Sequence, residues 1–162
     1  LDINLARPAA PHFIDPIPGD ACGISAEQRV RELAAHLDVR AEFMQLDPDA
    51  LFALPSALAA HRVRDLPTAV AGDASRQDLD PLNAVHKVVG HMLLDGVPTT
   101  DLTLALDTRV GFATVRAAAA VGFGAVATTA GVTSMAVELA RQTNTVLVGG
   151  VSAERFSVYA GA

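Results

Sequence analysis

The sequence contains one cysteine, Cys22, three residues ahead of a serine that could begin a helix. Ser25 is followed by apolar residues at helical spacing over 26–37, which predicts a helix capped by that serine. Backbone N–H groups at a helix start favour an anion, so they would stabilise a thiolate or a persulfide at Cys22. The alternative is a small buried side chain, because free cysteines are among the most buried residue types. Cys22 is the first candidate for covalent chemistry.

Five other side chains have the right type and place to bind an anionic ligand. Arg109 stands between an expected strand and an expected helix, where a guanidinium can hold a phosphate with two parallel hydrogen bonds. Thr133 and Ser134 open another expected helix, where N–H groups and hydroxyls would act together on a phosphate. Asn83 and Lys87 share one helical face at four-residue spacing. Helix capping by the hydroxyls and simple solvent exposure of the others are the alternatives.

The sequence lacks the usual patterns of zinc sites and serine hydrolases. His86 and His91 are five residues apart on an expected helix, so they do not share a face, and there is no second cysteine. No Gly-x-Ser-x-Gly motif is present. The cysteine and histidine ligands and the glutamate motif of a zinc deaminase are missing as well. We predict no zinc and no other metal site.

Strands and helices alternate through the second half of the chain. The expected strands are 102–106, 125–129, 145–148 and 155–159, and the expected helices are 83–94, 112–121 and 133–142. Parallel strands need a crossover that usually contains a helix, so this order predicts an α/β fold with a mostly parallel sheet covered by helices. Ligands in such sheets bind beyond the carboxyl ends of the strands, here residues 107–109, 129–134 and 149–152.

The first half of the chain is less regular. The four prolines between Pro8 and Pro18 predict an extended arm over residues 1–21, ahead of one folded domain over 22–162. A helix is expected from Asp47, with Pro48 at its first position, and Pro55 should divide it into two short helices. We read residues 62–80 as a loop with one strand over 68–71.

Composition excludes several classes of protein. A formal net charge of −6 argues against nucleic acid as a partner, since that affinity depends on Lys and Arg contacts with phosphates. The longest apolar runs, near 117–121 and 146–151, are too short to cross a membrane. The sequence shows no basic segment followed by an apolar core, which is the pattern of a signal peptide. One cysteine fits a reducing compartment. We therefore expect a cytoplasmic protein.

Three stretches of the sequence together resemble one known family. They are the run from Asn83 to Gly90, the segment Ala136–Ala140, and the closing Arg155–Tyr159. In these stretches the chain is similar to the FdhD family, the accessory sulfurtransferases of formate dehydrogenase. The resemblance runs from about Cys22 to the end of the chain and keeps the order and spacing of the motifs over the last half.

The resemblance implies a fold, a reaction and a set of partners. The family has a cytidine-deaminase-like, three-layer α/β core without catalytic zinc. Its members are cytoplasmic, take sulfur as a persulfide from a cysteine desulfurase, and pass it to the molybdenum bis(molybdopterin guanine dinucleotide) cofactor of formate dehydrogenase. Cys22 matches the first cysteine of the family's Cys-Gly-x-Cys-Gly motif, so the resemblance makes it the persulfide carrier.

The resemblance also assigns cofactor-binding residues. Phe156, Ser157, Val158 and Tyr159 match the family's terminal Phe-Asn-Val-Tyr segment, and Ala160 and Gly161 continue it. Arg109 matches the arginine that follows a sheet strand, and Asn83 and Lys87 match two positions of the Gly-Arg-His-Asn-Ala-x-Asp-Lys stretch. With Thr133 and Ser134 these residues form the expected site for the molybdenum cofactor.

This chain departs from the family pattern in ways that leave two hypotheses open. Ser25 replaces the second cysteine, and residues 80–82 read Asp-Pro-Leu in place of Gly-Arg-His. The Thr-Gly-Gly-x-His stretch is not recognisable in 66–75, and we do not expect the family's domain ahead of the cysteine motif in this chain. One hypothesis is a sulfur carrier serving formate dehydrogenase. The other is a non-catalytic relative that binds a GDP-like nucleotide or the cofactor, or pairs with another protein. An exposed edge strand and apolar helices also favour a homodimer.

Overall fold

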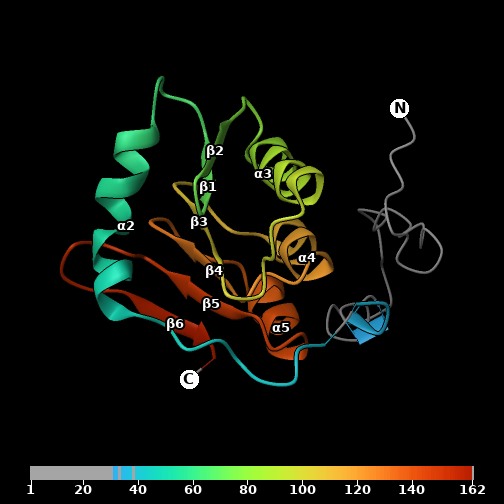
Figure 1. The fold of residues 1–162 in the computed structure, drawn as a ribbon. Coiled ribbons are helices and arrows are strands. Elements are labelled where there is room, and N and C mark those ends of the chain that lie inside the picture. Colours follow the sequence, from blue (N-terminus) through green and yellow to red (C-terminus); the bar gives the residue numbers. More distant parts are fainter. Residues whose placement is uncertain (1–30, 33, 38, 162) are drawn as a thin grey trace, which may run out of the picture.

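The computed structural model describes residues 31–32, 34–37 and 39–161, and in them a six-stranded sheet has the order β2-β1-β3-β4-β5-β6 (Figure 1). The strands are β1 (Thr68–Ala71), β2 (Ala74–Gln77), β3 (Thr103–Leu106), β4 (Ala125–Thr128), β5 (Val146–Gly149) and β6 (Ser157–Ala160). The helices are α2 (Pro48–His61), α3 (Pro81–Asp95), α4 (Phe112–Ala120) and α5 (Ser134–Gln142). The elements predicted from residue 83 onward are confirmed, with bounds that differ by two residues or fewer. The predicted arm over 1–21 lies outside the described residues.

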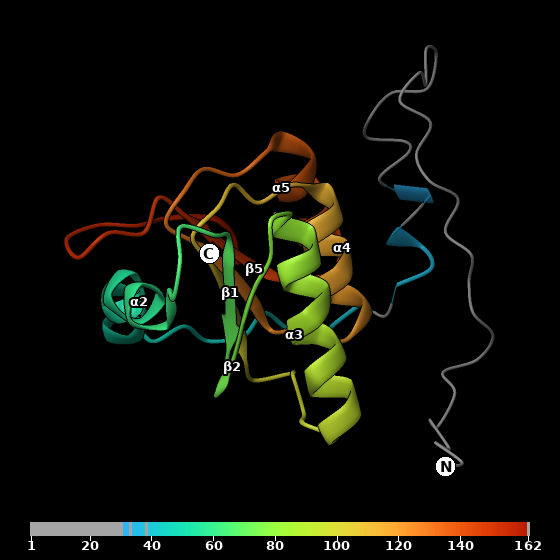
Figure 2. The same cartoon turned by 90° about the horizontal axis from the view of Figure 1, so that it is seen from above.

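The helices cover both faces of the sheet, as Figures 1 and 2 show. Leu104, Val126 and Leu147 point from the three central strands into a core shared with α3, α4 and α5. Their neighbours along the strands point the other way, because successive side chains of a strand alternate between faces, and they pack against α2. The three-layer α/β architecture is therefore present. None of the described helices is long and apolar enough to span a membrane.

The sheet is mixed, so the prediction of a mostly parallel sheet is wrong for the outer strands on both sides. Strands β3, β4 and β5 are parallel, but β1 pairs antiparallel with β2 and with β3, and β6 pairs antiparallel with β5. The physical reason lies in the connections. Residues 72–73 join β1 to β2, and residues 150–156 join β5 to β6, with no helix in either connection. Such short links favour antiparallel pairs.

Helix α2 is one continuous helix and not the predicted pair of short ones. Asp47 caps its start by accepting a hydrogen bond from the backbone N–H of Asp49, and Pro55 lies inside it. Proline removes one backbone donor and usually bends or breaks a helix. Here Leu51, Leu54 and Leu58 are all buried on the face that meets the sheet. Tertiary packing of this face on both sides of Pro55 outweighs the lost hydrogen bond.

The region read as a loop with one strand is a β-hairpin. Strand β1 has the predicted bounds, and β2 pairs with it from Thr68–Gln77 to Ala71–Ala74. The sequence of β2 is Ala-Ser-Arg-Gln, of which only Ala74 is buried. A strand at the side of a sheet needs no apolar alternation on its solvent side, so hydrophobic patterning did not reveal it.

Candidate functional site

The carboxyl ends of the three parallel strands meet in one place, which we call the carboxyl edge: residues 107–110, 128–133 and 149–152. An isolated bridge joins Val110 to Val132, with hydrogen bonds from Val110 N–H to the Gly131 carbonyl at 3.1 Å and from Thr133 N–H to the Val110 carbonyl at 3.0 Å. The N–H of Gly150 donates to the Ala130 carbonyl at 2.7 Å. These loops therefore lie side by side, as expected for ligand-binding loops of a parallel sheet.

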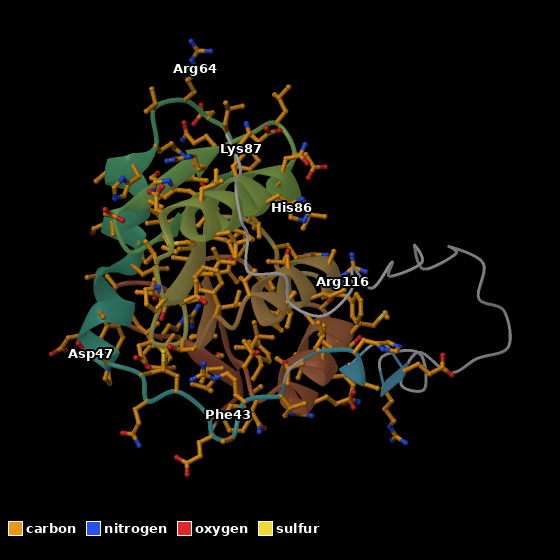
Figure 3. All side chains as sticks on the ribbon, turned by 45° about the vertical axis from the view of Figure 1, so that its right-hand side comes forward. Phe43, Asp47, Arg64, His86, Lys87 and Arg116 are labelled. Carbon is orange, nitrogen blue, oxygen red and sulfur yellow. The ribbon has the colours of Figure 1, made fainter. Side chains whose placement is uncertain are left out.

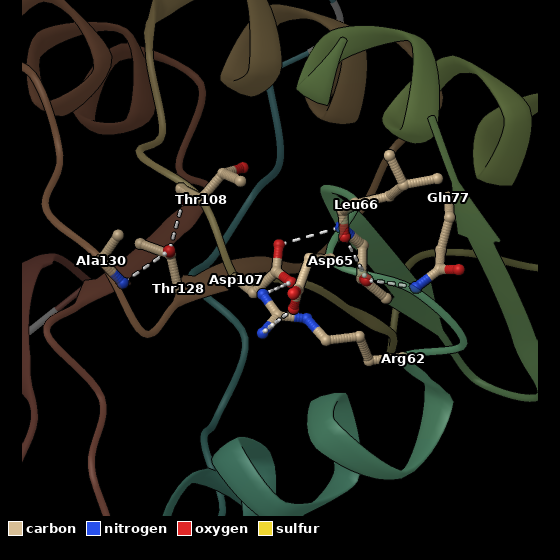
Figure 4. A network of polar contacts seen from close by, with 9 residues as sticks. Arg62, Asp65, Leu66, Gln77, Asp107, Thr108, Thr128 and Ala130 are labelled. Atoms are coloured by element: carbon tan, nitrogen blue, oxygen red, sulfur yellow. Dashed lines mark hydrogen bonds and ion pairs between the residues drawn. The ribbon is translucent and has the colours of Figure 1, made fainter. Parts of the chain in front are cut away.

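The side chain of Asp107, which directly follows β3, contacts several segments of this edge (Figure 4). One carboxylate oxygen accepts a hydrogen bond from the buried N–H of Thr68 at 2.9 Å, and the other lies 3.0 Å from Nη2 of Arg62. Gln77 in turn donates to the Thr68 hydroxyl at 2.9 Å. The side chain of Asp107 is only 11% exposed. This carboxylate thus fixes the end of α2, the start of β1 and the end of β3 against one another.

A second polar contact ties the neighbouring loop. The hydroxyl of Thr128 donates to the Thr108 carbonyl at 2.6 Å and accepts from the N–H of Ala130 at 3.0 Å (Figure 4). The hydroxyl oxygen of Thr108 is buried and has no hydrogen-bond partner within the part of the chain that the structure describes. Sequence analysis did not single out Thr128, and no local signal marks it, because its partner is 20 residues away.

Three of the predicted site residues stand on these loops. Arg109 is exposed, and Thr133 caps α5 by accepting from the N–H of Ala136 at 3.3 Å. Ser134 is exposed at the first position of the helix. Because the bridge from Val110 to Val132 brings their loops together, Arg109 and the start of α5 lie at one side of the carboxyl edge. A guanidinium beside a helix start is an arrangement suited to an anion.

Asn83 and Lys87 lie at the start of α3, next to β2. Strand β2 runs in the same direction as β3, so the start of α3 also lies at the carboxyl edge of the sheet. Lys87 Nζ lies 2.5 Å from Oδ2 of Asp78, and Asn83 Nδ2 donates to Oδ1 of the same carboxylate at 3.4 Å. The hydrogen bond from Lys87, followed by that from the backbone N–H of Asp80, holds the pKa of Asp78 at about 2, below its ordinary value of 3.8.

The terminal segment 156–161 does not lie wholly at this edge. Strand β6 runs antiparallel to β5, with Ser157 opposite Gly149 and Ala160 opposite Leu147. The segment therefore begins at the carboxyl edge and ends at the opposite edge. Phe156 packs on α2, where its ring centroid is 5.2 Å from that of Phe52. The structure thus places Phe156 and Ser157 at the carboxyl edge, at the side of the sheet away from Asn83 and Lys87, and carries Ala160 and Gly161 to the opposite edge.

Within β6, the exposed positions differ in their surroundings. Val158 and Tyr159 are 37% and 40% exposed, whereas Ala160 is buried. The Tyr159 carbonyl accepts a hydrogen bond from Nη2 of Arg141 at 3.3 Å, and its ring lies close to Gly149. Val158 and Tyr159 are therefore open to a ligand or partner at the side of the sheet.

We call the other end of the strands the amino edge, which comprises residues 39–47, 99–102, 122–124, 143–145 and Gly161. A pocket of about 870 Å³ lies at this edge. It is lined by residues 40–47, by Ala50, Leu51 and Leu54 of α2, and by Thr100, Asp101 and Thr103. Figure 3 shows Phe43 and Asp47 well apart from Lys87. The pocket thus contains none of the predicted site residues.

The predictions about cysteine and metals have different outcomes. Cys22 lies outside the described residues, so its role stays a prediction. Among the residues that are described, no group of three His, Cys, Asp or Glu side chains could hold a metal ion. His86 is exposed, and His91 lies 3.3 Å from the Asp95 carboxylate. The two histidines face different surroundings on α3.

Comparison with known proteins places this arrangement in a family. The model of the FdhD/NarQ family matches residues 17–162. A sulfur carrier protein FdhD from Corynebacterium efficiens is 31% identical over 153 residues, which cover 87% of this chain and 55% of that protein. A sulfur carrier protein FdhD from Nocardia farcinica is 29% identical over 181 residues, covering 100% of this chain and 63% of the relative. The chain thus spans less than two thirds of the length of these relatives.

The fold has a counterpart of known structure. A crystal structure described as a formate dehydrogenase accessory protein from Desulfotalea psychrophila superposes with a TM-score of 0.69 over 80% of this chain and 60% of that one. The two sequences are 18% identical, so the likeness concerns the fold. The family match includes Cys22, the loops of the carboxyl edge and β6. The chain belongs to the FdhD/NarQ family.

Proposed function

We propose that this chain is a sulfur carrier that serves the maturation of formate dehydrogenase. The observation that carries the proposal is the family match over residues 17–162, which contains Cys22. Two relatives with 31% and 29% identity are named sulfur carrier protein FdhD. The partners are then a cysteine desulfurase, which donates the sulfur, and formate dehydrogenase, which receives the finished cofactor. The setting is the cytoplasm.

In the proposed first step, the Cys22 thiolate attacks the outer sulfur of a persulfide on the desulfurase. A new S–S bond forms at Cys22, the S–S bond on the desulfurase breaks, and the desulfurase cysteine leaves as a thiolate. One cysteine is enough for this exchange, so Ser25 in place of the family's second cysteine removes a relay thiol and not the carrier itself. Cys22 then passes the sulfur on to the molybdenum cofactor.

The carboxyl edge is the proposed site for the molybdenum cofactor, which is the substrate of the transfer. Arg109 and the start of α5, with Thr133 and Ser134, would hold phosphate groups of the guanine dinucleotide through charge and backbone N–H groups. Asn83 and Lys87 would hold another anionic group at the start of α3. Phe156 and Ser157 border the same edge, and the remainder of β6, Val158 to Gly161, would extend the surface along the side of the sheet.

A second candidate is a relative that binds a GDP-like nucleotide or the cofactor without transferring sulfur. The start of α3 favours it, because Asp80 serves there as the helix cap and Asp78 neutralises Lys87, where the family pattern has a basic pair. In this case nucleotide binding, or pairing with another protein or a second copy, would not depend on Cys22. A closer likeness of the core to cytidine deaminases belongs to either candidate and stays a prediction.

Intact-mass analysis tests the proposal directly. The protein is incubated with a cysteine desulfurase and cysteine, beside the Cys22→Ala variant and Ser25→Ala as the matched control. The sulfur carrier is expected to gain one sulfur atom that a reductant removes, in the original chain and in Ser25→Ala but not in Cys22→Ala. An unchanged mass, with the thiol still open to alkylation, would contradict the carrier role and favour the second candidate.

A further inference from the structure

The carboxylate of Asp78 occupies the anion-binding groups at the start of α3. Its Oδ2 lies 2.5 Å from Lys87 Nζ. Its Oδ1 accepts from the backbone N–H of Asp80 at 3.1 Å and from Asn83 Nδ2 at 3.4 Å. Lys87 also donates to the Gln77 carbonyl at 3.3 Å. One carboxylate therefore engages both residues of α3 that the proposed cofactor site requires.

The charges around this carboxylate do not favour a second anion. Asp80 caps α3 by accepting from the N–H groups of Leu82 and Asn83 at 2.7 and 3.3 Å. Two carboxylates and one ammonium group thus give the start of α3 a net negative charge while Asp78 stays in place. A phosphate brought to Lys87 would meet like charges, which costs binding energy.

Asp78 can move without disturbing the core. Its side chain is 21% exposed and that of Lys87 is 51% exposed, so both reach solvent, and neither belongs to the buried apolar clusters of the fold. With a pKa of about 2, this carboxyl is ionised at neutral pH. The contact is an ion pair at the surface, and such pairs are weak enough for a ligand to replace.

We propose that Asp78 is an internal competitor for the cofactor site, an acidic side chain that must leave Lys87 and Asn83 before a phosphate of the guanine dinucleotide can bind there. This inference rests on the proposed function of the carboxyl edge and adds a regulatory contact to it. It predicts that the site discriminates by charge, since only a ligand with enough negative charge displaces Asp78. A nucleoside without phosphate is then unaffected by this contact.

Calorimetric titration with GDP and with guanosine tests the inference on the original chain and on Asp78→Asn. The variant keeps a similar shape and loses the competing charge, so it should bind GDP roughly three- to ten-fold more tightly, with guanosine unchanged. Asp95→Asn is the matched control, because Asp95 pairs with His91 at the other end of α3. Its affinity for GDP should stay that of the original chain.

Lys87→Met separates competition from a general effect of charge. Combined with Asp78→Asn, it should abolish the gain in affinity, because the freed ammonium group is what binds the phosphate. Equal or weaker GDP binding by Asp78→Asn would overturn the inference and leave the proposed site in place. If neither protein binds GDP or inorganic pyrophosphate, the cofactor site fails together with this inference. The mass measurement on Cys22 then decides the sulfur-carrier role independently.

Discussion

At the carboxyl edge of the sheet, charged and hydroxyl side chains meet backbone N–H groups in the loops. At the amino edge, residues 39–47 pack directly on the turns that precede β4 and β5. Asp107 exemplifies the first edge, with its contacts to Thr68 and Arg62. Met44 exemplifies the second, since it lies against the backbone at Gly124. The comparison indicates that the two edges are held in different ways: polar side-chain contacts join the loops of the carboxyl edge, whereas residues 39–47 pack on the amino edge and line the pocket there.

The amino edge is fastened by backbone contacts as well as by packing. Arg40 donates from its N–H to the Thr143 carbonyl at 3.3 Å and from Nη1 to the Gly122 carbonyl at 3.2 Å. Asn144 donates to the Arg40 carbonyl at 2.7 Å. Residues 39–47 are thereby held to the turns before β4 and β5, and they connect the helical layer to α2. Changes that remove buried contacts at either edge should therefore lower the stability of the fold, whereas changes to exposed side chains of the carboxyl edge should affect binding.

The largest effect on stability is expected from Gly124→Ala at the amino edge. A Cβ there would overlap the Thr100 carbonyl oxygen and lie about 2.5 Å from Sδ of Met44, and the carbonyl cannot move without moving the chain. We expect a loss of roughly 2–3 kcal/mol in the free energy of unfolding, measured by urea denaturation.

Gly131→Ala provides the matched control at the carboxyl edge. Gly131 is exposed, and a Cβ there would have no other atom within 4 Å. Its free energy of unfolding should stay within about 0.5 kcal/mol of the original value. Equal losses in the two glycine variants would show that the edges do not differ in packing.

The next effect in size concerns the polar contacts of the carboxyl edge. Asp107→Ala leaves the buried N–H of Thr68 without its acceptor, which should cost about 1–3 kcal/mol of the free energy of unfolding. Asp107→Asn keeps an acceptor oxygen and loses the charge that faces Arg62, so thermal and urea unfolding should show a smaller loss. A larger loss of stability in Asp107→Asn than in Asp107→Ala would mean that the ion pair, and not the hydrogen bond to Thr68, stabilises this edge.

Much of the fold could be predicted from sequence, because apolar runs at strand and helix spacing are local signals. The central strands and α3 to α5 were found in this way. Strand β2 was missed because only one of its residues is buried, and the continuity of α2 through Pro55 depends on packing against the sheet. The antiparallel direction of β6 is set by its pairing with β5, which no pattern within β6 encodes.

The candidate site was predictable in its position and less so in its contacts. Arg109, Thr133 and Ser134 follow strands or open helices, and the topology alone brings such residues to one edge. The partner of Asp107 is 39 residues distant in sequence, and that of Lys87 precedes the helix in a stretch read as loop. Long-range partners of this kind leave no local spacing signal, so the role of Asp78 emerged only from the structure.

Arg109→Ala should separate binding from stability at the carboxyl edge. Arg109 is exposed, so its removal should change the free energy of unfolding by less than about 0.5 kcal/mol. If it holds a phosphate, GDP binding should weaken about ten-fold, because a charge-assisted pair is lost. Arg109→Lys should recover part of the affinity. Arg116→Ala, within α4, should leave GDP binding unchanged.

The smallest expected effect is the pH dependence of stability contributed by Asp78. Its pKa is about 2 in the folded chain against 3.8 ordinarily, so folding favours the ionised form. The contribution is then fully present above pH 3.8 and is lost as the pH falls toward 2, where both states become protonated. Urea midpoints of the original chain and Asp78→Asn should differ most at neutral pH and converge across that interval. A difference that stays constant as the pH falls would show that the ion pair with Lys87 does not stabilise the fold. Asp78 would then compete less strongly with an incoming phosphate at the start of α3.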